Sequence, residues 1–306
     1  MSSGKGVNLA ASVHQKLINA ARKTDANPND VFVRYAMERL LYRLSISKHK
    51  KDFVLKGAML FLAWTGETYR PTFDLDLLGF GADSTVRISD VFKELCVLNV
   101  EADGLVFDPG NVEVRPIREA NEYTGQRVTL VAFLGKARIP VQVDIGFGDA
   151  VTPKAELIDF PAILDFPQPR IRAYPRETVV AEKLHAMTIL GIGNSRMKDF
   201  FDVYVLARDF EYDGPTLTNA IKATFKRRKT EFPQETPMAL TNEFGRDATK
   251  KVQWKAFLRK GGLDHKTPEL LEVLSALREF LLPPLMAASG NEKPPARWKS
   301  GGPWKN

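Results

Sequence analysis

The sequence predicts an α/β protein, in the α+β sense, with a mixed sheet in its first half and a mainly helical second half. Three patterns support this. Apolar residues recur at helical spacing near the N-terminus, short or alternating apolar runs bounded by glycine and proline extend to about residue 148, and helical spacing returns after the proline-bearing segment 159–175. A chain of 306 residues is long enough for two lobes, each with its own core.

The composition is that of an ordinary globular protein, with 44% hydrophobic and 10% aromatic residues. No apolar run approaches the roughly 20 residues of a membrane span, and the opening segment lacks the apolar core of a secretory signal, so we expect a soluble chain. The single cysteine, Cys96, cannot form an internal disulfide, which is typical of a cytoplasmic protein. Four scattered histidines, without CxxC or HExxH, leave no basis for a zinc site.

The first elements read as two helices followed by a strand-to-helix junction. Apolar residues at helical spacing predict helices over 13–21 and 31–47, with a break and a cap supplied by residues 27–30. Segment 51–64 then runs from a short apolar strand into a helix, and Gly57 lies where the two meet. Further along, Asp83 or Ser84 can cap a helix through residues 90–96.

Strand patterns then predominate up to residue 148. Segments 104–108 and 112–117 flank a turn at Pro109-Gly110-Asn111, and segments 127–135 and 137–148 read as an antiparallel hairpin. In the last of these Val141, Val143 and Ile145 alternate with Gln142 and Asp144, so Asp144 faces away from the apolar side.

The second half begins with a helix over 176–190, interrupted by Gly191-Ile192-Gly193-Asn194 and followed by a helix over 195–210. We therefore expect N-terminal helices and a sheet-containing core over 1–150, a helical lobe over 151–286, and a flexible basic tail over 287–306, which is rich in proline, glycine and lysine.

Asp74 and Asp76 stand one residue apart in RPTFDLDLLGFG, a run that otherwise reads as a buried strand. Side chains alternate along a strand, so both carboxylates point the same way about 6.5 Å apart, while Phe73, Leu75 and Leu77 point into the core. Two like charges against a core are costly unless a positive partner compensates them, and two oxygen-rich groups suit a hard divalent ion such as Mg²⁺. The alternative is an edge strand whose polar face lies in water.

The context of this pair favours the metal. Upstream, Gly57 and Ala58 form a small-residue turn where backbone N–H groups can approach phosphate, and downstream Asp144 offers a third carboxylate on a later strand. This order of features resembles the polymerase-β-like nucleotidyltransferases. The resemblance implies that the three carboxylates hold two Mg²⁺ ions beside a nucleoside triphosphate (NTP).

A narrower resemblance rests on FVLKGAMLFLAWTGETYRPTFDLDLLGFG, AEKLHAM and RMKDFFDVYVL, which occur in this order. Over roughly residues 30–285 the chain resembles the AbiEii/AbiGii family, the nucleotidyltransferase toxins of type IV toxin–antitoxin systems, to which the MenT toxins also belong. Ala58 departs from the Gly or Ser of many members, so a phosphate contact there must come from backbone N–H groups. The resemblance implies an antitoxin encoded nearby, with a stable complex left open.

The resemblance also implies roles for residues in the helical half. Lys183 is expected to contact the nucleotide phosphates and Asp199 to complete the site; without the resemblance, Lys183 reads as the solvated side of an amphipathic helix. Asp202 lies near the same face as Asp199 and can instead anchor Lys198 or Arg196 in an ion pair. His185 is either a proton acceptor or a packed or surface residue.

Basic residues suggest an anionic partner such as RNA. The net charge is +7, and IKATFKRRKTEF and the tail place arginine and lysine near aromatic residues, which can bind phosphates and stack on unpaired bases. A solvated helix face and a floppy tail explain the same residues. Lys56, Arg70, Arg127 and Arg138 border the expected site in sequence and are candidates for triphosphate or acceptor contacts, with Lys56 assigned to the nucleotide.

The function expected from the resemblance is transfer of a nucleoside monophosphate from an NTP, with release of pyrophosphate, at a site between the two lobes. Similarity to the MenT toxins implies a tRNA 3′ end as the acceptor, which would block aminoacylation and inhibit translation. Two alternatives remain open: a nucleotidyltransferase that modifies a protein or a small molecule, and a catalytically silent RNA-binding protein on the same fold.

Overall fold

The computed structural model describes residues 3–67, 69–119, 123–265 and 267–305, which fold as two compact units. The first unit comprises Met1–Gly148 and Glu156–Ala173, and the second comprises Asp149–Ala155 and Tyr174–Asn306. The chain therefore returns to the first unit after residue 150, where the sequence pattern suggested that the helical lobe begins. None of the described helices is both long and apolar enough to span a membrane.

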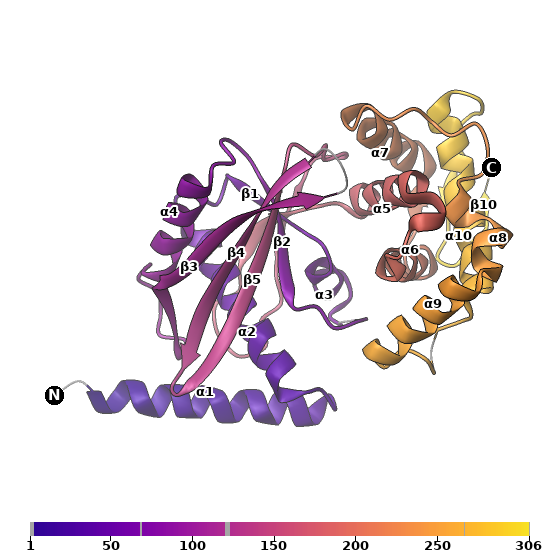
Figure 1. The fold of residues 1–306 in the computed structure, drawn as a ribbon. Coiled ribbons are helices and arrows are strands. Elements are labelled where there is room, and N and C mark those ends of the chain that lie inside the picture. The colour runs from indigo at the N-terminus through magenta and orange to yellow at the C-terminus, as the bar shows by residue number, and fades with distance from the viewer. Residues whose placement is uncertain (1–2, 68, 120–122, 266, 306) are drawn as a thin grey trace. The chain divides into compact units, whose positions relative to one another are not determined.

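A mixed sheet forms the centre of the first unit (Figure 1). Within the described residues it has seven strands in the order β3-β4-β5-β2-β1-β7-β6. The strands are β1 (Phe53–Lys56), β2 (Asp74–Gly79), β3 (Leu105–Glu119), β4 (Tyr123–Leu134), β5 (Ala137–Phe147), β6 (Glu156–Asp159) and β7 (Arg170–Ala173). The pair β4–β5 is the predicted antiparallel hairpin, whereas β2 runs parallel to β5 and β1 parallel to β7.

The remaining differences from the predicted strands have local causes. Segments 104–108 and 112–117 form one strand, β3, whose pairing with β4 shifts register between Asp108 and Glu113. The Asp108 carboxylate accepts a hydrogen bond from the Gly110 N–H at 2.8 Å, which stabilises this irregularity. The proline-bearing segment 159–175, read as loops, contains β7 and the last residue of β6, and its prolines lie outside both strands and so interrupt neither.

The helices in the described part of the first unit are α1 (Ser3–Lys23), α2 (Pro28–Ile46), α3 (Met59–Thr65) and α4 (Thr85–Cys96). The predicted cap of α2 is confirmed, since the Asn27 side chain accepts a hydrogen bond from the Asn29 N–H. Ser84, and not Asp83, caps α4, because its hydroxyl accepts from the Arg87 N–H at 3.3 Å. Helices α2 and α4 pack on one face of the sheet (Figure 1). That face carries the alternating Val141, Val143 and Ile145, so the opposite face is left for polar side chains.

A buried ion cluster connects α2 to the loop before β3. Asp103, 1% exposed, accepts hydrogen bonds from Arg39 Nε at 3.1 Å and Arg43 Nη1 at 2.7 Å. Its backbone oxygen also accepts one from the Tyr35 hydroxyl at 2.7 Å. Because the Asp103 carboxylate pairs with both guanidinium groups, α2 can bury two arginines against the core of the sheet.

The second unit is mainly helical, as predicted. Its helices are α5 (Arg176–Leu190), α6 (Met197–Asp209), α7 (Gly214–Arg227), α8 (Asn242–Arg246), α9 (Ala248–Gly261) and α10 (Leu270–Ser289), with the 3₁₀ turns η1 (Gly191–Gly193) and η2 (Met238–Leu240). The break predicted at residues 191–194 is η1. The Asn194 side chain follows it and accepts a hydrogen bond from the Arg196 N–H at 2.8 Å, just before α6.

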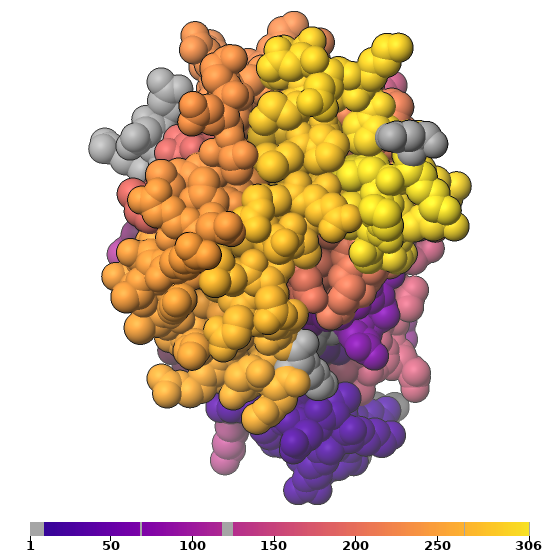
Figure 2. Space-filling view, turned by 90° about the vertical axis from the view of Figure 1, so that its right-hand side faces the viewer, coloured from indigo at the N-terminus to yellow at the C-terminus, as the bar shows by residue number. Residues whose placement is uncertain are grey.

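The C-terminal residues are ordered, in contrast to the flexible tail that their composition suggested. Strands β8 (Tyr212–Asp213), β9 (Arg297–Trp298) and β10 (Trp304–Lys305) form a small sheet within the described part of this unit. Trp298 is 2% exposed, and its indole N–H donates to the Ala207 carbonyl at 2.7 Å. Its ring lies 4.9 Å from that of Phe280, so buried tryptophan surface outweighs the disorder tendency of proline and glycine. Figure 2 shows these last residues (yellow) on the surface of the unit.

Candidate active site

The three predicted carboxylates converge on the polar face of the sheet. Oxygen atoms of Asp74, Asp76 and Asp144 all lie within 4.8 Å of one another. Strand β2 pairs in parallel with β5 so that Asp76 is directly opposite Asp144, and Asp74 is opposite Gln142. Because side chains two residues apart share a face, this register brings all three acidic groups together.

A row of charged residues crosses four neighbouring strands at this level. Lys56 on β1 is opposite Asp76, Asp76 is opposite Asp144, and Asp144 is opposite Arg127 on β4. The two carboxylates in the middle are thus flanked by a cation on each side. Such an arrangement offsets part of the repulsion between like charges, which is required if they are to remain together on a packed sheet.

Arg127 holds Asp144 with both ends of its guanidinium group. Nε donates to one carboxylate oxygen at 2.8 Å and Nη2 to the other at 2.7 Å. Hydrogen bonding to Asp144 raises the pKa of Arg127 above its usual value, and the charges of Asp74 and Asp76 add to the effect. The sequence identified Arg127 only as a candidate substrate contact; the structure shows that it fixes the orientation of Asp144.

Gly57 forms the turn between β1 and α3, as predicted, and its backbone lies against the Asp76 carboxylate. Its φ is +77°, a left-handed conformation that favours glycine. A Cβ added here would meet Asp76 Oδ2 at 1.9 Å, far inside van der Waals contact. Ala58 follows with φ −70° and makes no side-chain capping bond. The turn therefore brings bare backbone next to a carboxylate.

Two neutral side chains that the sequence had not indicated as site residues support the carboxylates. The Thr72 hydroxyl donates to Asp74 Oδ1 at 2.9 Å, and Gln142 Nε2 lies 3.5 Å from Asp144 Oδ2. Each stands two residues before the aspartate that it contacts. The same period of two that grouped Asp74 with Asp76 is the signal that could have identified them.

Lys183 and Asp199 belong to a second cluster, within the helical unit. Lys183 Nζ on α5 lies 2.6 Å from Asp199 Oδ1 and 2.9 Å from Asp202 Oδ2, both on α6. Asp199 also pairs with Arg196 at 2.6 Å, whereas the sequence suggested Arg196 or Lys198 as a partner of Asp202. Both aspartates thus pair with Lys183, so the geometry does not single out either Asp199 or Asp202 as the functional aspartate. The expected position of the site between the lobes remains a prediction.

His185 and Arg228 are part of a third polar group in the helical unit. The imidazole contacts the Thr230 hydroxyl at 2.9 Å and Arg228 at 3.2 Å. Burial, followed by the charge of Arg228, lowers the pKa of His185 to about 4. Arg228 in turn donates to Asp149 at 2.9 Å. Arg228 is therefore turned inward, while its neighbours Lys226 and Arg227 in the predicted basic cluster are exposed.

The carboxylates of Asp74, Asp76 and Asp144 form a candidate metal site. Carboxylate oxygens are the ligands that hard divalent ions prefer, and the spacing of these three groups fits such an ion. Such a site, next to a small-residue turn, can hold a metal ion together with the phosphates of a nucleotide.

Comparison with known proteins gives the family. No curated protein shows significant sequence similarity to the chain. Among solved structures, JHP933 from Helicobacter pylori aligns with a TM-score of 0.44 and 15% identity over 95% of this chain and 92% of that one. A candidate nucleotidyltransferase from H. pylori aligns with a TM-score of 0.43 and 14% identity over 94% of each chain. The model of the nucleotidyl transferase AbiEii toxin family of type IV toxin–antitoxin systems matches residues 39–276. The chain therefore belongs to the AbiEii family of nucleotidyltransferase toxins.

Proposed function

We propose that this nucleotidyltransferase moves a nucleoside monophosphate from an NTP to an RNA acceptor, the 3′ end of a tRNA, and thereby blocks aminoacylation and inhibits translation in the cytoplasm. The convergence of Asp74, Asp76 and Asp144 beside the Gly57 turn is the observation that carries the proposal. Membership of the family implies an NTP substrate and an antitoxin partner.

The carboxylates are proposed to hold Mg²⁺, with two ions as the working number. When bound, such ions neutralise charge on the phosphate oxygens and lower the pKa of an attacking hydroxyl. In the transfer itself, the acceptor oxygen forms a bond to the α-phosphorus while the bond from this phosphorus to pyrophosphate breaks. Pyrophosphate leaves with the electron pair, and the hydroxyl proton passes to solvent.

The chain's own residues position the two substrates. The backbone of Gly57 and Ala58, with Lys56 on the adjoining strand, is proposed to hold the triphosphate, because this turn lies against Asp76. Asp144, held in one orientation by Arg127, is proposed to help activate the acceptor hydroxyl. Phosphoryl transfer depends mainly on such positioning and on charge neutralisation.

Lys183 is proposed to supply a further positive charge to the phosphates, oriented by Asp199 and Asp202. Lys183→Met should raise the KM for NTP by about tenfold or more, since one charge-assisted contact is worth ~1.4 kcal/mol or more. Lys198→Met is the matched control, because Lys198 is exposed on the neighbouring helix. An unchanged KM in the Lys183 variant would remove this residue from the site.

RNA is favoured as the acceptor by exposed cations on two helices of the second unit. Helix α9 exposes Lys251, Lys255, Arg259 and Lys260, and α7 exposes Lys222 and Lys226. Rows of lysine and arginine on a helix surface attract a phosphate backbone in a salt-dependent way.

The test is incubation of the protein with each labelled NTP and total cellular RNA, followed by nuclease or protease treatment. Nuclease-sensitive label is expected for the wild type. Asp76→Asn should abolish transfer without a change in melting temperature, and Asp90→Asn, an exposed carboxylate on α4, should leave transfer intact. Protease-sensitive label would show that the acceptor is a protein. The absence of label with every NTP, or full activity of the Asp76 variant, would contradict the proposed reaction.

A further inference from the structure

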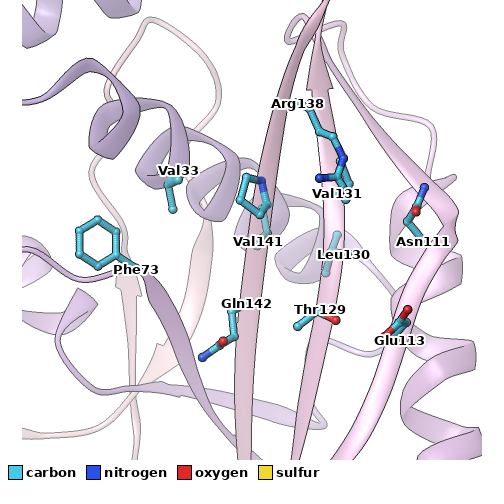
Figure 3. A pocket seen from close by; sticks show the side chains of 11 residues that line it. Val33, Phe73, Asn111, Glu113, Thr129, Leu130, Val131, Arg138, Val141 and Gln142 are labelled. Atoms are coloured by element: carbon cyan, nitrogen blue, oxygen red, sulfur yellow. The ribbon is translucent and has the colours of Figure 1, made fainter.

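A pocket of about 440 Å³ lies in the first unit, on the polar face formed by β3, β4 and β5 (Figure 3). This is within the range of small-molecule sites and large enough for one nucleotide. Phe73 stands at one side, Asn111 and Glu113 at the opposite side, and Gln142 and Thr129 lie between them (Figure 3). Apolar wall and floor are thus combined with a small number of polar groups.

The pocket adjoins the carboxylate site. Gln142 lines it, and the same side chain lies 3.5 Å from Asp144 Oδ2. Gln142 is also opposite Asp74 in the pairing of β2 with β5, and Phe73 is the residue immediately before Asp74. The nearest part of the lining, Gln142, is therefore two residues, about 6.5 Å along β5, from Asp144.

The lining is suited to an unpaired nucleotide. The strand pattern predicted Phe73 in the core, and this is wrong: β2 begins only at Asp74, and Phe73 is 50% exposed. It offers a ring face on which a base can stack. Gln142 and Asn111 carry amide groups that can both donate to and accept from base edges, and Arg138 supplies a cation for a phosphate. The negative charge of Glu113 is offset by Arg115 at 2.9 Å.

The position of the pocket separates it from the expected NTP site. The Gly57 turn meets Asp76 from the β1 side, whereas the pocket lies beyond Asp144 on β5, β4 and β3. In phosphoryl transfer the attacking and leaving oxygens are roughly in line, so they approach the reacting phosphorus from opposite sides. With pyrophosphate leaving on the β1 side, the hydroxyl that attacks must come from the pocket side.

We propose that this pocket binds the 3′-terminal nucleotide of the acceptor RNA, with its base on Phe73 and its amide contacts from Gln142. The inference rests on the proposed function and assigns to it a site for the acceptor end. According to this proposal, the polar face of the sheet in the first unit selects acceptors that have a single-stranded 3′ end.

Binding of RNA can be measured separately from transfer, by fluorescence anisotropy without NTP. The probe is a short single-stranded RNA labelled at its 5′ end, compared with the same strand paired to its complement. Phe73→Ala should raise the Kd for the single strand by about ten- to a hundredfold, because stacking on an aromatic ring contributes this much per base. Gln142→Ala should weaken it in the same direction. Phe80→Ala is the matched control, because Phe80 is 42% exposed at the other end of β2 and outside the pocket.

The outcomes distinguish the pocket from the reaction. Normal transfer by the wild type, with unchanged RNA binding in the Phe73 and Gln142 variants, would overturn the pocket and leave the reaction standing. If the Phe73 and Gln142 variants raise the KM for NTP and leave RNA binding unchanged, the pocket holds the donor nucleotide. If the Phe80 variant loses as much RNA affinity as they do, the effect is non-specific. Either result overturns the inference. Weaker RNA binding in a protein that transfers no label would retain the pocket and reject the reaction.

Discussion

Replacing Gly57 by alanine tests whether the turn after β1 determines the position of Asp76. The added Cβ would lie 1.9 Å from Asp76 Oδ2, and contacts under 3.0 Å are essentially never seen for a real Cβ. The carboxylate must therefore move by about 1.1 Å or more. A displacement of ~1 Å in a reacting constellation costs about a hundredfold in rate, so transfer should fall by at least that factor.

The same substitution also affects stability, and this effect must be separated from the clash. An L-residue in the left-handed region costs ~1–2 kcal/mol, which lowers the melting temperature by roughly 2–8 °C for a unit of this size. Gly66→Ala provides the matched control, because Gly66 has φ +75° at the end of α3 and nothing within 4 Å of an added Cβ. It carries the backbone strain without the clash.

Melting temperature by circular dichroism and kcat/KM for label transfer would be measured for both variants. The expected result is a similar loss of stability in the two proteins and a loss of activity only in Gly57→Ala. Wild-type activity in that variant, or equal losses of activity in both, would refute the view that Gly57 is required by the position of Asp76.

Three further predictions concern the packing of each unit. Asp103→Asn leaves Arg39 and Arg43 buried without their carboxylate and should lower the free energy of unfolding by about 3–5 kcal/mol in urea titrations. Glu94→Gln, which removes the carboxylate of an exposed ion pair, should leave this free energy unchanged. Equal effects of the two substitutions would contradict the view that burial makes the Asp103 pairs important. Burial raises the pKa of Glu38 to about 7 in the folded state, from 4.5 in the unfolded state. Between these pH values the folded state keeps a proton that the unfolded state has released. The free energy of unfolding should therefore fall by up to ~3 kcal/mol as the pH rises from about 4.5 to 7. Glu38→Gln should remove this part of the slope, and an unchanged slope would reject the assignment. Trp298→Ala should cost ~3–5 kcal/mol in denaturant unfolding of the second unit, and a negligible cost would indicate a loosely attached C-terminal segment.

The period of two along strands made part of the site predictable. It places Asp74 and Asp76 on one face of their strand and Asp144 on the polar face of its own strand. This prediction needs only the alternation of these aspartates with buried valines and leucines, which the sequence shows directly. The pairing of β2 with β5 could not be derived in this way. It joins segments that are distant in sequence, and its register is set by packing across the whole sheet.

Partners of charged side chains were also beyond the sequence. Position in the sequence alone made Lys56, Arg70, Arg127 and Arg138 candidates for substrate contacts. Strand register directs Arg127 to Asp144 instead. Likewise, Arg39 and Arg43 lie on a helix of ordinary pattern, and only the distant Asp103 makes their burial possible. The C-terminal segment was misjudged because composition reports average tendencies, whereas the burial of individual tryptophans determines whether a short strand is held.

The order of the acidic strands along the chain has a consequence for synthesis on the ribosome. Asp74 and Asp76 are made first, and the whole β3–β4 hairpin must follow before β5 brings in Asp144. A nascent chain that stops before residue 137 carries two of the three acids and lacks β5, the strand that carries the third. The acidic centre therefore comes into existence only after β5 has been translated and has paired with β2, so premature termination within the hairpin yields a product without it.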